Sequence, residues 1–157
     1  MTICRNLQQA WPSRAAARIL AFFILLLFAA CGRGQHSENG LVFGGWYIVK
    51  PVVDRGMATA YGQITNVQSE TKVLTTVAID CADKVELHET VESAGRVSML
   101  GLADVTLPAG ATISFQPGGK HLMISGFKSP TSGKCEATFT VAGRPIRFAI
   151  PVRARTN

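Results

Sequence analysis

The sequence lacks the features that mark several common classes of enzyme and of nucleic-acid-binding protein. It has no zinc-protease motif, no nucleophile elbow and no glycine-rich phosphate loop. Lysine and arginine are scattered, with no basic run and no interleaved aromatic stripe, so no nucleic-acid partner is expected. Beyond Ala30 no stretch keeps a helical hydrophobic period, which disfavours a helical domain.

The first 30 residues have the composition of an export signal. They contain three basic residues and no acidic one: Arg5, Arg14 and Arg18. The apolar run Ile19–Ala30 is shorter than the roughly 20 residues that a transmembrane helix needs. We therefore predict a signal peptide over residues 1–30 and an exported, periplasmic protein. Removing the signal leaves 13 basic and 10 acidic residues, a weakly positive chain.

Cys31 follows Phe28-Ala29-Ala30 in a pattern that resembles a bacterial lipobox, in which the cysteine is lipidated and anchors the protein to a membrane. The lipobox usually has Leu, Val or Ile where this chain has Phe28, and ordinary cleavage near Cys31 is the alternative. Residues 31–40 are polar and are expected to form a tether, with His36 a polar linker residue. One domain is expected over residues 41–153, followed by a short tail over 154–157.

Cys81 and Cys135 are the two cysteines of the expected domain. In an exported protein, a widely spaced pair of this kind is most simply a structural disulfide. A redox-active or copper-binding thiol pair is the alternative, although the chain has no Cys-x-x-Cys spacing.

Strand signals dominate the domain, and turn-forming residues separate the strands. We expect nine strands, near Leu41–Lys50, Met57–Thr65, Lys72–Ile79, Val85–His88, Arg96–Leu100, Thr112–Phe115, His121–Ser125, Cys135–Val141 and Ile146–Val152. Short strands at this spacing predict an all-β antiparallel sandwich or barrel.

The most informative pattern is His88, ten residues, Met99, twenty-one residues, then His121-Leu122-Met123. It contains two imidazoles and two thioethers but no carboxylate. This soft set suits Cu(I) better than Zn(II), Mg(II) or Ca(II). Thioether sulfur is also less easily lost to oxidation than a thiolate in an oxidising compartment.

Strand alternation predicts where three of these side chains point. His121 and Met123 are two apart and should share the face opposite Leu122, and His88 should point away from the core at a strand end. Met99 shares a face with Val97, so a regular strand that buried Val97 would bury Met99 as well. A bulge or loop within residues 96–99 would remove the conflict.

Together these segments resemble the periplasmic copper chaperone family PCuAC over roughly residues 41–153. The resemblance includes Val85–Thr90, Met99, the Pro108-Ala109-Gly110 turn and Pro117–Met123. It implies a cupredoxin-like β fold that binds one Cu(I) per chain through four ligands: His88, Met99, His121 and Met123. It also implies delivery of copper to the CuA centre of cytochrome c oxidase subunit II, or exchange with a thioredoxin-like copper chaperone. Many members have a Met- and His-rich tail; residues 153–157 lack one, so no second site is expected there.

Competing functions differ in what they require of the same residues. An enzyme would need a general base, and Glu89, the nearest candidate, should face away from His88. A blue-copper site would need a cysteine with two histidines, and no histidine follows His121. A lipoprotein that buffers copper for tolerance stays open, as does a structural domain with the motif unoccupied. We expect a copper carrier rather than an enzyme.

Overall fold

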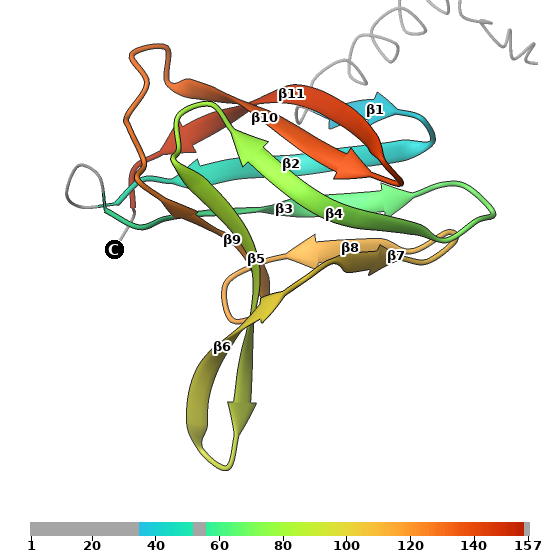
Figure 1. Ribbon diagram of the computed structural model, residues 1–157, viewed down its shortest axis with the longest axis horizontal. Helices are drawn as coiled ribbons and strands as arrows, with labels where there is room; N and C mark the ends of the chain where they lie inside the picture. Colours follow the sequence, from blue (N-terminus) through green and yellow to red (C-terminus); the bar gives the residue numbers. More distant parts are fainter. Residues whose placement is uncertain (1–34, 52–55, 156–157) are drawn as a thin grey trace, which may run out of the picture. The chain divides into compact units, whose positions relative to one another are not determined.

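The computed structural model describes residues 35–51 and 56–155, and every helix or strand assigned in these ranges is a β-strand (Figure 1). The strands are β1 (Gln35–Glu38), β2 (Leu41–Val49), β3 (Ala58–Asn66), β4 (Lys72–Ile79), β5 (Lys84–Ser93), β6 (Arg96–Leu102), β7 (Val105–Leu107), β8 (Thr112–Phe115), β9 (Lys120–Ser125), β10 (Lys134–Val141) and β11 (Arg144–Arg153). Among the described residues, no helix is present that is long and apolar enough to cross a membrane.

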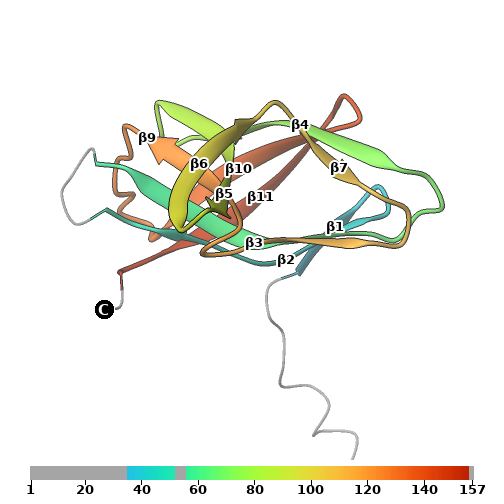
Figure 2. The same cartoon turned by 90° about the horizontal axis from the view of Figure 1, so that it is seen from below.

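The strands follow one hydrogen-bonded path, β6-β5-β9-β8-β3-β2-β11-β10-β4-β7, with β1 added beside β2. Most pairings are antiparallel, as expected, but β2 pairs with β11 and β8 with β9 in parallel. The path curves back over itself, so that β4, β10 and β11 lie across from β3, β8 and β9 (Figures 1 and 2). Side chains from both layers fill the core, including Phe43, Ile64, Leu74, Leu122, Phe139 and Ile150. The predicted all-β sandwich or barrel is confirmed.

All nine expected strands are present, and two further strands were not predicted. β1 lies within the residues expected to form a tether, and it pairs with β2 from Gln35 opposite Gly44 to Glu38 opposite Leu41. His36 of β1 stacks on the Phe148 ring, with 5.1 Å between the ring centroids, so it is a packed strand residue rather than a linker residue. β7 is three residues long. Neither strand is long and apolar enough to show alternation in the sequence.

Strands β5 and β6 form a hairpin whose tip projects from the sandwich (Figure 1). Residues Lys84–Glu89 of β5 pair with β9 on one side, whereas Thr90–Ser93 pair with β6 alone. Residues 92–101 are all exposed. The base of the hairpin is thus part of the packed sandwich, and its tip is held by one strand pairing.

Candidate metal centre

The four residues predicted as copper ligands lie on one face of the neighbouring strands β6, β5 and β9. His88 of β5 is directly opposite His121 of β9, and Met123 is two residues further along β9. Met99 of β6 is opposite Thr90, two residues from His88. Opposed residues, and residues two apart on one strand, share a face. All four side chains therefore point to the same side, which we call the His/Met face.

The two imidazoles lie close enough to bind one ion between them. The ring centroids of His88 and His121 are 5.9 Å apart. A metal–nitrogen bond of about 2.0–2.1 Å puts each ring centre roughly 3 Å from a bound ion, so this separation fits a single ion. Among the described residues, the buried Nδ1 atom of His88 has no hydrogen-bond partner. Burying such a nitrogen without a hydrogen bond is costly, and a metal ion would satisfy it.

His121 is held more firmly than the other three residues. Only 5% of it is exposed, and its Nδ1 lies 3.0 Å from the carbonyl oxygen of Gly119. A carbonyl only accepts, so Nδ1 donates and the lone pair of Nε2 is left for a metal. The same carbonyl accepts the Thr90 amide at 3.1 Å, which ties β5 to this loop. Gly118 has φ of +76°, the left-handed conformation that lets the chain turn back into β9.

Met99 and Met123 lie on either side of the histidine pair along the strands. Met99 is 62% exposed, and Met123 is half-buried. The expected conflict between Met99 and Val97 does not arise. Val97 is 64% exposed and the β5–β6 register is regular, so no bulge is needed. A buried Val97 was compatible with the sequence, because the sequence alone does not reveal that β6 lies outside the core.

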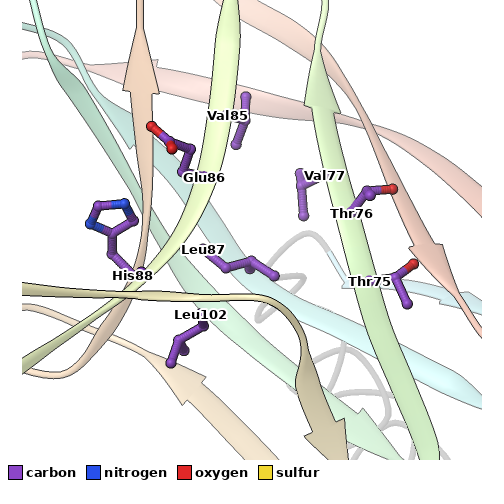
Figure 3. A pocket seen from close by; sticks show the side chains of 9 residues that line it. Thr75, Thr76, Val77, Val85, Glu86, Leu87, His88 and Leu102 are labelled. Atoms are coloured by element: carbon purple, nitrogen blue, oxygen red, sulfur yellow. The ribbon is translucent and has the colours of Figure 1, made fainter.

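The two faces of β5 have opposite chemistry (Figure 3). Val85 and Leu87 turn toward Val77 of β4. A cavity of about 300 Å³ is lined by residues from both faces of β5, Glu86 and His88 included. Glu86 and His88 turn the other way, to the His/Met face. Alternation along one strand thus separates the apolar interior from the polar donors.

Glu86 places one negative charge on the His/Met face, opposite Met123. The Lys84 ammonium lies 2.7 Å from its carboxylate and, by this hydrogen bond above all, holds the pKa of Glu86 below its usual range. The carboxylate is therefore ionised at neutral pH. Glu89, by contrast, pairs with Lys120 of β9 at 2.6 Å and lies on the opposite face from His88.

A groove of about 930 Å³ opens beside His121 and Met99. Three cations line it: Lys50, Arg153 and Arg155. No carboxylate is among its lining residues in the described ranges, and the Arg153 guanidinium lies 4.4 Å from the centre of the Tyr47 ring. This groove was not predicted from the sequence, because its cations come from the end of β2 and the end of β11, about a hundred positions apart in the chain.

Cys81 and Cys135 form a disulfide, with their Sγ atoms 1.99 Å apart. Asp80 lies beside them, and its Oδ1 accepts the Glu136 amide at 3.0 Å. Bonded sulfurs offer no thiolate to a metal. The pair links the end of β4 to the start of β10 and therefore supports the sandwich. The expected signal at residues 1–30 and the lipidation candidate Cys31 lie outside the described residues.

Sequence comparison matches residues 43–152 to a family model described as "Putative lipoprotein LpqE-like". The chain is also 31% identical over 124 residues to the "Putative lipoprotein Lxx21020" of Leifsonia xyli subsp. xyli (strain CTCB07). That alignment covers 76% of this chain and 73% of the relative.

Solved structures with the same fold include PCuAC domains. The copper-bound PCuAC domain from PmoF2 matches with a TM-score of 0.64 at 16% identity, covering 77% of this chain and 98% of that domain. Apo-DR1885 from Deinococcus radiodurans, solved in solution, matches with a TM-score of 0.56 at 22% identity, covering 99% and 96%. The expected resemblance to PCuAC and its cupredoxin-like fold is therefore confirmed.

Proposed function

The chain belongs to the LpqE-like family and has the fold of PCuAC domains, and on that basis we propose that it is an exported copper carrier. It binds one Cu(I) ion per chain on the His/Met face. The ligands are the two imidazoles of His88 and His121 and the two thioethers of Met99 and Met123. The copper-bound PmoF2 domain gives a precedent for copper on this fold.

The observation that supports this proposal most directly is the state of the two histidines. Within residues 35–51 and 56–155, the buried Nδ1 of His88 has no hydrogen-bond partner, and His121 has its Nδ1 engaged by the Gly119 carbonyl. Their rings are 5.9 Å apart on strands that are hydrogen-bonded to each other. Two free ring nitrogens on neighbouring rings, with two thioethers on the same face, form a donor set that matches Cu(I) and matches hard cations poorly.

The exposure of the ligands suits copper that is carried and released, rather than copper that is kept as a permanent cofactor. His121 is almost fully covered, while Met99 stands at the edge of the groove with most of its surface open. An acceptor can therefore displace a thioether first and the imidazoles afterwards. The leaving thioethers and imidazoles are neutral and the copper stays Cu(I), so the transfer needs no electron. Where the incoming donor is a cysteine of the acceptor, its thiol gives up its proton to water as the copper–sulfur bond forms.

We further propose that the copper goes to a protein acceptor, such as the CuA site of cytochrome c oxidase subunit II or a thioredoxin-like copper chaperone. The open groove beside Met99 provides access for such a partner. Lipidation at Cys31 would hold the carrier at a membrane surface, in agreement with the name of its Leifsonia relative. The alternative is a periplasmic lipoprotein that buffers copper in tolerance without a specific acceptor.

The binding claim is tested by titrating the purified protein with Cu(I) under anaerobic, reducing conditions against a chromophoric Cu(I) chelator. We expect one equivalent to bind tightly in the wild type and to be lost in the His121→Ala/Met123→Ala variant. A Val97→Ala/Leu100→Ala variant is the matched control, because both residues are exposed on β6 and offer no donor. Copper binding that survives the double substitution at 121 and 123 would exclude this site.

The rate of Cu(I) transfer to different acceptors distinguishes delivery from buffering. If the protein delivers copper, an apo CuA fragment should take Cu(I) from it faster than a small chelator at equal concentration does. A buffer would release copper to both at its own dissociation rate.

A further inference from the structure

All three methionines that follow Met1 lie on one surface of the molecule. They are Met57, Met99 and Met123, and none of them belongs to the buried core of the described ranges. Methionine is commonly used to fill irregular gaps in a core. Here the core is built mainly from Leu, Ile, Val, Phe and Ala, with Trp46 and the disulfide-bonded cysteines, and the three methionine side chains lie outside it. Two of these methionines are proposed copper ligands, and the third has no role in that site.

Met57 lies on the His/Met face, directly before β3. Ala58 pairs with Ile124 and Thr59 with Met123, so Met57 comes opposite Ser125. The Ser125 hydroxyl donates to the Met57 sulfur at 3.5 Å, which places this thioether on the same side of β9 as Met123. Met57, Met99 and His121 also line the same groove.

The spacing along the strands separates Met57 from the histidine pair. Residues two apart on a strand are about 6.5–7 Å apart, so Met57 lies one such step beyond Met123 and two steps beyond His121. A long, flexible thioether at that position can share an ion with Met123 but cannot reach an ion held between the two imidazoles. Met57 therefore extends the line of donors rather than completing the four-ligand site.

We propose that Met57 is an exchange ligand that, together with Met123, receives Cu(I) from the histidine pair and presents it in the groove to the acceptor. This inference rests on the proposed function. Cu(I) keeps its bond to Met123 while its bonds to His88, His121 and Met99 break, and a new Cu(I)–thioether bond to Met57 forms once the ion has moved along Met123. The copper stays Cu(I), and the three released ligands leave as neutral groups. The acceptor then provides the next donor.

The exposure of Met57 and the charges around it both favour the release of Cu(I) from this position. Met57 is 52% exposed, against 5% for His121, so an ion that moves there moves from a covered position to an open one. The groove is lined by Lys50, Arg153 and Arg155, whose positive charges disfavour a cation held close to them. The carboxylate of Glu86 lies opposite Met123 on the same face, but it is paired with the Lys84 ammonium. Met57 and Met123 thus form a low-affinity binding site, from which copper is readily lost to a partner.

The test compares three proteins: the wild type, Met57→Leu, and Met57→Leu/Val67→Met. Leucine keeps the size and apolar character of the side chain and removes the sulfur. Val67 is exposed and follows the far end of β3, about 30 Å along the strand from Met57. The double variant therefore restores the number of methionines without restoring the position.

Two measurements are made on each protein: the Cu(I) affinity by chelator competition, and the rate of Cu(I) transfer to that chelator by stopped flow. We expect affinity to stay within about threefold in all three proteins, since the four-ligand site is intact, and transfer to slow about tenfold in both Met57→Leu proteins. In the wild type, carbon-13 methyl spectra of the methionines should show the Met99 and Met123 signals shifting with the first equivalent of Cu(I), and the Met57 signal shifting as a second equivalent is added.

Transfer rates within twofold of the wild type, together with a Met57 methyl signal that does not move at two equivalents, would overturn the inference while leaving a one-copper carrier in place. Recovery of the rate by Val67→Met would also overturn it, because position would then be irrelevant. A wild-type protein that binds no Cu(I) would overturn both the inference and the proposed function.

Discussion

The sandwich and the β5–β6 hairpin contribute to the candidate site in different ways. His121 belongs to β9, which is flanked by β5, β3 and β8, and only 5% of it is exposed. Met99 belongs to β6, which pairs with β5 alone at the edge of the strand order, and 62% of it is exposed. The sandwich thus fixes an imidazole, and the hairpin offers a thioether.

This difference separates the two requirements on a copper carrier. Affinity requires donors held in place before the ion arrives, because ordering a side chain costs conformational entropy. Release requires at least one donor that a partner can reach and displace. Placing the histidines at the base of the hairpin and Met99 further out along it provides both within a single sheet.

The largest difference between the two regions should be in stability. Leu122 is fully buried on the core side of β9, so Leu122→Ala should lower the free energy of unfolding by about 2–5 kcal/mol. Val97 on the hairpin is mostly exposed, and Val97→Ser should change it by no more than about 0.5 kcal/mol. Urea unfolding followed by tryptophan fluorescence measures both. Similar losses in the two variants would mean that the hairpin is packed in solution.

The disulfide should support the sandwich and leave the His/Met face intact. It closes a sequence separation of 54 residues, and Cys81→Ala/Cys135→Ala should lower the free energy of unfolding by about 2–4 kcal/mol. Neither cysteine lies on β5, β6 or β9, so Cu(I) affinity should change by less than about threefold. Thermal unfolding and chelator competition on the same sample give the two numbers. A collapse of Cu(I) affinity in a folded variant would show that the two regions are coupled.

The smallest of these effects should be the difference between Cu(I) and Cu(II) in the affinity that one substitution removes. Met99→Leu should weaken Cu(I) binding about tenfold and Cu(II) binding much less, because Cu(II) prefers nitrogen and oxygen donors. His121→Ala should weaken both by about 100-fold. Parallel titrations with Cu(I) and Cu(II) measure the ratio for each variant. Equal loss of both ions in Met99→Leu would mean that its sulfur is not a ligand.

The sequence predicted much of this molecule because its signals are local. Alternation and turn residues located nine strands, and the parity of Leu122 correctly separated His121 and Met123 from the core. β1 and β7 were not foreseen, since a short strand has too few residues to alternate and is fixed by its partner. Met99 could not be placed either, because its exposure depends on β6 being an edge strand, which is a tertiary property. The role proposed for Met57 likewise depends on cross-strand register with Ser125, which no spacing in the sequence reveals.

The central claim is that one Cu(I) lies between the two histidines with thioethers completing its shell. X-ray absorption at the copper edge tests it most directly, on the Cu(I)-loaded protein prepared with selenomethionine. We predict two nitrogen neighbours and two selenium neighbours, with the selenium signal reduced by half in Met99→Leu. A shell of nitrogen and oxygen alone would contradict the account.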